Sequence, residues 1–267
     1  MTKSWEVYAL KYSERNDRTR ADSFIFEENI HQQHDMDYFI WLLRCNDELI
    51  LVDTGYDARD AVPRQRPTLR EPADALRQFG VRPEDITDLV ITHLHYDHAG
   101  GLPQFPNATI HIQAAEVAYA TGPCMCHDAL RMPYTASHLC DLIQRIYSGR
   151  VVFYEGDAQI ADGVIAYQIG GHSRGLQALG VQTESGTLCL ASDASHYYEN
   201  VFLRKPFPIV VDTQDMLDGF NRLEEIATDR SLIIPGHDPL VTSYFPNWQD
   251  CDFIYRLDKG SKIPFDL

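Results

Sequence analysis

The sequence predicts an α/β (α+β) fold in which helices lie outside a pair of packed β-sheets. The chain has 267 residues, 44% of them hydrophobic, so it can bury a large core. Short apolar runs rich in β-branched and aromatic residues alternate with segments of helical periodicity. This alternation occurs in two similar halves, a pattern that favours two sheets with helices on their outer faces.

Strands are predicted wherever a short apolar run is bounded by turn-forming residues. In chain order these runs are residues 5–11, 38–44, 48–53, 88–92, 109–113, 151–154, 164–169, 178–183, 187–191 and 232–234. The first two are rich in aromatic and β-branched side chains. Asn46-Asp47 joins the second run to the third and has the composition of a hairpin turn.

Helices are predicted where apolar residues recur with a helical period. They cover residues 68–79, 114–120, 137–147 and 216–226. The first is expected to begin at a capping box formed by Thr68 and Glu71 and to stop at Gly80.

All of these elements are assigned to a single domain, residues 1–267. Two segments interrupt the rhythm of strands and helices. Residues 13–37 are polar and irregular, and we expect them to form an N-terminal flap over a pocket. Residues 122–150 contain Gly122-Pro123 and one predicted helix, and we interpret them as an insertion near the mouth of that pocket.

Charge and composition exclude several classes of protein. A net charge of −16 repels phosphate backbones and argues against nucleic-acid partners. The chain has no run of 18 apolar residues, and its N-terminus lacks the basic-then-apolar order of a signal peptide. We therefore expect a cytoplasmic protein without a membrane segment. The six cysteines are scattered without C-x-x-C spacing, so we do not expect a disulfide framework.

Residues 93 to 98, which read His-Leu-His-Tyr-Asp-His, concentrate metal-binding side chains. After a predicted strand, His93 and His95 can face one side, while the next turn directs Asp97 and His98 towards a neighbouring point. Imidazoles and carboxylates favour zinc, manganese or iron over copper(I). The motif therefore predicts a site for two metal ions.

Three later strand ends offer the remaining ligands. His172 follows two glycines, Asp193 ends a strand, and His237 follows Gly236. Glycine lets the backbone approach a metal closely. Each residue alone is a weak signal, but their order and matched strand–loop context predict that both halves of the chain contribute to one site.

This order of residues resembles the metallo-β-lactamase superfamily over roughly residues 38–240. The resemblance implies an αβ/βα four-layer sandwich that binds two divalent metal ions, with zinc expected. The implied ligands are His93, His95 and His172 for the first metal, Asp97, His98 and His237 for the second, and Asp193 as a bridge. Asp53 matches a position that supports the ligands from behind.

Within the superfamily, the sequence is most similar to the N-acyl-homoserine lactonases, the quorum-quenching branch. β-Lactamases of this fold carry Cys or Ser in place of Asp193, and flavodiiron proteins replace His95 with glutamate. Too few residues follow His237 for the helical C-terminal domain of glyoxalase II-like thioesterases. The overall length and the Asp193-Ala-Ser run also favour the lactonases.

The resemblance implies that a metal-bridging hydroxide opens a small lactone ring, with Asp97 passing a proton to the leaving alkoxide. Lactonases place a tyrosine three positions after the bridging aspartate, where this chain has His196. Either His196 or the neighbouring Tyr197 is expected to polarise the substrate carbonyl. Two alternatives remain: a hydrolase of another ester, thioester or cyclic amide on the same site, and an iron-dependent redox enzyme.

The remaining histidines are not expected to bind metal. His31, His34, His127 and His138 lie in polar loops or at helix starts and are expected to face solvent, the first two near the pocket mouth. A small lactone or ester is the expected partner. The aromatic-rich N-terminal segment is compatible with a homodimer.

Overall fold

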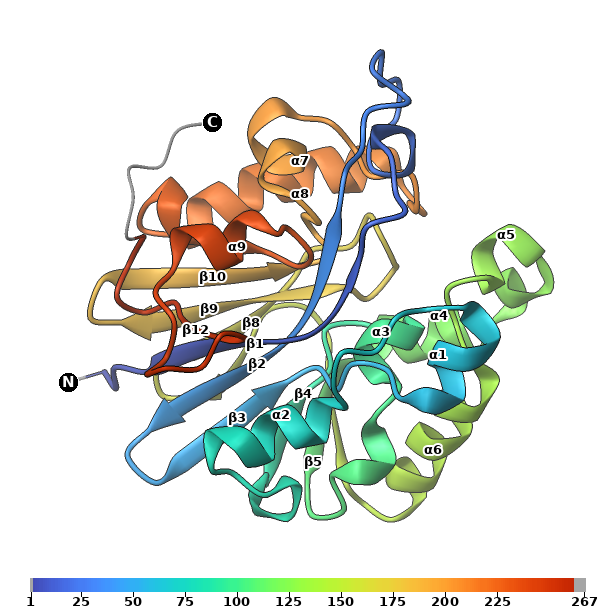
Figure 1. Cartoon of the computed structure of the whole chain (residues 1–267). Helices are drawn as coiled ribbons and strands as arrows, with labels where there is room; N and C mark the ends of the chain where they lie inside the picture. The colour runs from blue at the N-terminus through green and yellow to red at the C-terminus, as the bar shows by residue number, and fades with distance from the viewer. Residues whose placement is uncertain (1, 262–267) are drawn as a thin grey trace.

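The computed structural model describes residues 2–261 and contains two β-sheets with helices outside them, which confirms the predicted fold class (Figure 1). The strands are β1 (Glu6–Arg15), β2 (Met36–Cys45), β3 (Glu48–Val52), β4 (Asp88–Val90), β5 (Thr109–Gln113), β6 (Val151–Tyr154), β7 (Ala158–Ala161), β8 (Val164–Gln168), β9 (Gln177–Thr183), β10 (Gly186–Ser192), β11 (Ile233–Pro235) and β12 (Ile254–Arg256). The helices are α1 (Ala58–Arg64), α2 (Pro72–Phe79), α3 (Tyr96–Ala99), α4 (Ala114–Ala120), α5 (Asp128–Arg131), α6 (Ala136–Tyr147), α7 (Tyr198–Leu203), α8 (Thr213–Ile226) and α9 (Leu240–Tyr244).

The strand order places most of each half of the chain in its own sheet. The first sheet runs β12-β1-β2-β3-β4-β5-β6, and the second runs β11-β10-β9-β8-β7. Strands β3 to β6 pair in parallel, and so do β10 and β11. Because parallel strands end at the same edge of a sheet, the residues that follow β10 and β11 lie side by side.

Both faces of the central strands are buried, since each sheet packs on the other sheet and on helices. Trp41 and Leu43 of β2 share one core cluster with Val181 of β9, between the two sheets. Leu42, on the opposite face of β2, packs in a second cluster with Phe79 of α2. Burying each such side chain contributes about 1.5–3 kcal/mol, so this alternation fixes the register of the strands on both faces.

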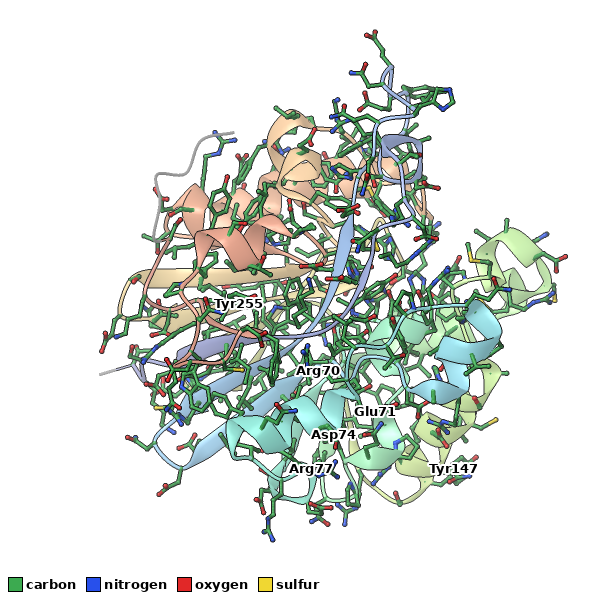
Figure 2. The ribbon with its side chains drawn as sticks, viewed as in Figure 1. Arg70, Glu71, Asp74, Arg77, Tyr147 and Tyr255 are labelled. Carbon is green, nitrogen blue, oxygen red and sulfur yellow. The ribbon has the colours of Figure 1, made fainter. Side chains whose placement is uncertain are left out.

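Helix α2 begins later than predicted, and the capping box at Thr68 is wrong. The helix starts at Pro72, with Glu71 as its extended N-cap (φ −68°, ψ 141°). Proline favours an extended residue before it and suits the first helical position, where its missing N–H has no intrahelical partner. Asp74 and Arg77 form an ion pair on the exposed face of α2 (2.6 Å; Figure 2).

Segment 13–37 is more regular at its ends than predicted, because β1 continues to Arg15 and β2 begins at Met36. The sequence pattern also missed two short strands, β7 and β12, and the short helices α1, α3, α5, α7 and α9. These helices have four to seven residues. Two turns or fewer leave too few positions to reveal a helical period.

The prediction that His138 faces solvent is wrong. Its side chain is 1% exposed, and its Nε2 lies 2.6 Å from Oδ2 of Asp60 in α1. Thr135 donates a hydrogen bond to the other carboxylate oxygen of Asp60 (2.8 Å). This buried pair joins segment 122–150 to α1. His31 and His127, by contrast, are exposed as predicted.

Among residues 2–261, no helix combines the length and the apolar character that crossing a membrane requires. All six cysteines are free thiols. Cys45 and Cys189 are buried, and the other four are partly or fully exposed.

Candidate metal centre

Four strand ends and one short helix bring the seven predicted metal ligands together. His93 and His95 follow β4, Asp97 and His98 lie on α3, and His172, Asp193 and His237 follow β8, β10 and β11. Their ligand atoms form three overlapping groups, each with all its atoms within 4.8 Å of one another: His93, His95, His172 and Asp193; Asp97, His98 and His237; and Asp193, His196 and His237. The first two groups contain all seven residues in the division that the resemblance implies, and the third adds His196.

Two glycines allow the loops of this site to approach closely. Gly171 has φ +81°, and a Cβ there would lie 2.6 Å from the backbone of Met216 in α8. A Cβ at Gly236 would lie 2.7 Å from Oδ1 of Asp193. Larger residues at these positions would therefore displace His172, Asp193 or both.

Asp193 lies between the first two groups and faces both. Its Oδ2 is 3.2 Å from Nε2 of His172 and 3.6 Å from Nε2 of His93. Its Oδ1 is 3.2 Å from Nε2 of His98 and 3.0 Å from Nε2 of His237. Asp193 thus presents one carboxylate oxygen to each of these two groups, an arrangement that would suit a bridging ligand.

Hydrogen bonds at Nδ1 orient three of the histidines. The Nδ1 partners are Oδ2 of Asp53 for His98 (2.7 Å), the carbonyl oxygen of Ile209 for His172 (2.7 Å) and the carbonyl oxygen of Asp37 for His237 (2.9 Å). A carbonyl oxygen only accepts, so Nδ1 of His172 and His237 carries the proton and Nε2 presents a lone pair. Asp53 is itself held by the backbone N–H of Thr92 (2.7 Å), as expected of a supporting residue.

The charges and unpaired atoms of these groups fit divalent cations. Burial lowers the pKa of His93 and His95 well below the usual value, so both are neutral, the form that binds metals. Burial acts against a charged Asp193, but His196 and His98 outweigh it and hold the pKa of its carboxyl well below the usual range. Nε2 of His93, Nε2 of His98 and Oδ1 of Asp193 are buried and have no hydrogen-bond partner within residues 2–261. A cation bound between them would compensate these unpaired atoms.

His196 and Tyr197 lie in different surroundings. Nε2 of His196 is 3.0 Å from Oδ2 of Asp193, and its ring stacks on Phe207 at 3.4 Å between centroids. Burial lowers the pKa of His196 to about 3. Tyr197 is buried in the direction of segment 13–37, with its ring centroid 4.3 Å from that of His34. His196 lines the cavity beside the predicted ligands, and Tyr197 is not among the lining residues.

Glu116 of α4 is a supporting residue that the sequence analysis missed. Its fully buried carboxylate accepts four hydrogen bonds. The donors are the backbone of Leu94 (3.0 Å), the hydroxyl of Tyr134 (3.2 Å), the hydroxyl of Ser173 (2.6 Å) and the backbone of Gly175 (3.0 Å). Glu116 thus ties the loop of His93 and His95 to the loop of His172. The only sequence signal is one acidic residue in an otherwise apolar helix.

Two cavities open beside the predicted ligands and share His95 and His172 in their walls. One, of about 490 Å³, is mainly apolar, with Leu130, Ile209 and Val211 among its lining residues. The other, of about 320 Å³, contains Asp97, Asp193, His196 and His237 in its wall, together with residues of segment 13–37. Both fall in or near the size range of small-molecule sites.

An ion-pair network holds segment 13–37 against α7, beside which it rises (Figure 1). Arg20 donates to both carboxylate oxygens of Glu199 (2.9 and 2.7 Å) and to Glu27 (2.8 Å). Lys205 donates a further hydrogen bond to Glu27 (3.0 Å). The hydrogen bonds from Arg20 lower the pKa of Glu199 from 4.5 to about 2.

Replacing Glu199 with glutamine should lower the free energy of unfolding by about 2 kcal/mol at pH 7, the typical effect of losing a charged hydrogen bond. A carboxyl whose pKa is lower in the folded state stabilises the fold above its unfolded pKa. The difference between E199Q and the wild type should therefore shrink as the pH falls from 4.5 towards 2. Urea denaturation of both proteins at a series of pH values measures this difference in the free energy of unfolding. Glu225→Gln, which removes a partly exposed ion pair with Arg222, is the control and should change stability by less than about 1 kcal/mol.

Comparison with known proteins identifies the family. The model of the Metallo-beta-lactamase superfamily matches residues 36–237. The chain belongs to the metallo-β-lactamase superfamily. An N-acyl homoserine lactonase of Bacillus cereus is 29% identical over 238 residues, which cover 83% of this chain and 88% of that protein. A probable metallo-hydrolase of Mycobacterium tuberculosis is 27% identical over 222 residues, 75% of this chain and 71% of that protein.

Solved structures in this superfamily have the same architecture. A crystal structure of a quorum-quenching N-acyl homoserine lactone lactonase superposes with a TM-score of 0.72 and 27% identity, covering 90% of this chain and 94% of the other. A structure of N-acyl homoserine lactone hydrolase, with the product N-hexanoyl-L-homoserine at its catalytic metal center, gives a TM-score of 0.73 and 26% identity, covering 90% and 95%. The predicted membership of the superfamily's metal-dependent hydrolases, and the similarity to its lactonase branch, are confirmed.

Proposed function

We propose that this chain is a dinuclear metal-dependent hydrolase that opens a small lactone ring. The observation that carries the proposal is the position of Asp193, with one carboxylate oxygen towards each group of ligand atoms. Lactonases among the relatives support the choice of substrate class. Hydrolysis of another ester, a thioester or a cyclic amide would use the same arrangement and is the alternative that a substrate panel must separate.

The proposed metal ligands are His93, His95, Asp97, His98, His172, Asp193 and His237. Neutral imidazoles with carboxylates suit zinc, which is the metal we expect. Two divalent ions, when bound, would supply Lewis acidity and hydroxide at neutral pH. The surrounding chain would position the substrate: we propose that segment 13–37 acts as a flap and that segment 122–150 forms the apolar wall.

Asp97, itself a proposed metal ligand, and His196 are the proposed catalytic side chains. The Asp97 carboxylate lines the cavity and is 12% exposed. It can therefore reach a bound substrate and pass a proton to the leaving alkoxide. His196 also lines the cavity, which favours it over Tyr197 as the group that polarises the substrate carbonyl. Tyr197 packs towards Phe24 and His34 instead.

Replacing His196 with alanine should therefore lower kcat by roughly 10²–10³-fold, the effect of losing one oxyanion donor. Tyr197→Phe is the matched control, because it removes one hydroxyl from the adjacent residue and should leave kcat nearly unchanged. Steady-state kinetics on the best lactone measures both. Full turnover by H196A together with a large loss in Y197F would reverse the two roles.

A substrate panel tests the proposed function itself. It should contain N-acyl-homoserine lactones with different acyl chains, simple γ- and δ-lactones, and aryl esters, thioesters and cyclic amides. We expect ring opening of at least one lactone class to exceed turnover of the other substrates. Activity confined to esters, thioesters or amides would refute the lactonase assignment and support the alternative.

A further inference from the structure

The cavity of about 320 Å³ is lined by several arginines as well as by predicted metal ligands. Arg15, Arg18, Arg64 and Arg66 all line it, and Asp22 is the one acidic lining residue outside the ligand set. This concentration of positive charge is notable in a chain with a net charge of −16. Two of the four arginines are committed elsewhere: Arg15 pairs with Asp17 (2.9 Å) and Arg64 with Asp60 (3.5 Å).

Arg18 has no carboxylate partner among the described residues. It is 8% exposed, and its Nη2 donates to the backbone carbonyl of Asp22 (2.7 Å). Its Nε is buried and has no hydrogen-bond partner in the part of the chain that the structure describes. The side chain of Asp22 accepts from Thr19 instead (2.8 Å). The guanidinium also contacts the hydroxyl of Ser23 (3.4 Å) and lies over the ring of Phe207 (5.8 Å to the centroid). No described carboxylate balances its charge, and burying such a charge costs free energy.

Arg66 is the other arginine of this cavity that has no ion pair among the described residues. It is half-buried, with Nε donating to the hydroxyl of Tyr96 (3.2 Å) and Nη1 to the carbonyl of Arg64 (3.1 Å). Arg18 and Arg66 reach the cavity from different segments, one in the proposed flap and one after α1. The Arg20–Glu199 ion pair anchors the flap and so fixes the neighbouring Arg18.

We propose that Arg18 and Arg66 bind an oxyanion substituent of the substrate, a carboxylate or a phosphate, while the group to be hydrolysed lies at the predicted metal ligands. This inference rests on the proposed function and narrows its substrate class to anionic lactones or esters. Guanidinium groups bind carboxylates and phosphates through paired, charge-assisted hydrogen bonds. The apolar cavity that shares His95 and His172 then accepts an uncharged part of the same molecule.

A matched substrate pair tests the proposal by kinetics. N-Succinyl-homoserine lactone carries a free carboxylate, and its methyl ester has the same skeleton without the charge. We expect the wild type to prefer the acid by at least about tenfold in kcat/KM, mainly through KM, as a charged hydrogen bond would give. Arg18→Met and Arg66→Met should each reduce this preference, and Arg18→Lys, which keeps the charge, should retain part of it.

Arg82→Met is the control, because it removes one positive charge from an arginine that is exposed and lies outside the cavity. R82M should leave kcat/KM for the acid and for its methyl ester unchanged, and with them the preference for the acid. Equal kcat/KM for the acid and its ester in the wild type would overturn the proposal. The same conclusion follows if R82M reduces the preference as much as R18M.

Binding measurements separate this proposal from the proposed function. Titration calorimetry on the metal-loaded protein would compare three ligands of similar length, in the wild type and in Arg18→Met. Pentanoate has one carboxylate, glutarate has a second carboxylate at the other end, and 4-phosphonobutanoate has a phosphonate there. We expect glutarate or the phosphonate to bind at least about tenfold more tightly than pentanoate, and the tighter of the two to identify carboxylate or phosphate as the preferred anion. Suppose that no lactone is hydrolysed, but that glutarate or the phosphonate still binds more tightly than pentanoate and R18M removes this difference in affinity. The lactonase assignment then fails and the anion site stands. If lactones are hydrolysed and the three ligands bind equally, the anion site fails and the hydrolase stands.

Discussion

Replacing Asp193 with alanine should remove at least one of two bound metal ions and lower kcat/KM by more than about 100-fold. Loss of a residue that merely supports a metal ligand costs about 10–100-fold, and Asp193 faces ligand atoms of both groups directly. Without this carboxylate, a second divalent ion would have only Asp97 to balance its charge. Elemental analysis after gel filtration, together with turnover of the best lactone, measures both effects.

The matched control for D193A is Asp250→Ala, which removes an exposed carboxylate that lines neither of the two cavities. It should leave the metal content and turnover unchanged. A D193A protein that still holds two ions per chain would contradict the bridging role of Asp193.

Replacing Glu116 with alanine should destabilise the fold by about 3 kcal/mol or more and weaken metal binding by about 10–100-fold. The substitution leaves four donors without their acceptor in a fully buried place, and each unpaired buried group costs about 1–3 kcal/mol. The metal effect follows because Glu116 joins the loop of His95 to the loop of His172, as a supporting residue does. Urea denaturation and competition with a chelator measure the two quantities.

Glu116→Gln separates the lost hydrogen bonds from the lost volume. Glutamine has nearly the same shape and keeps one acceptor oxygen, so it can serve about half of the four donors. E116Q should therefore lie between the wild type and E116A in both measurements. Wild-type stability in E116A would show that this carboxylate does not hold the two loops together.

The candidate site was predictable from sequence because its ligands carry local signals. His93 to His98 form a dense motif after a strand, and His172 and His237 each follow glycines at strand ends. The fold class was predictable for a similar reason, since long strands such as β2 alternate in their pattern of burial between two cores.

Apart from Asp53, which the resemblance implied, the supporting residues were not predictable, because they act between segments distant in sequence. Glu116 connects Leu94 with Gly175, and the segment that carries Arg18 is held by the ion pair between Arg20 and Glu199. None of these pairings has a local pattern. The expectation for His138 failed in the same way, since its partner lies on α1, a short helix that contains Pro63 and lacked a recognisable period.

The most direct test of a dinuclear hydrolase is metal analysis of the purified protein combined with lactone hydrolysis before and after chelation. We predict two divalent ions per chain, loss of ring opening when a chelator removes them, and recovery when zinc is restored. One iron per chain with oxygen uptake, or ring opening that persists in the metal-free protein, would contradict the account.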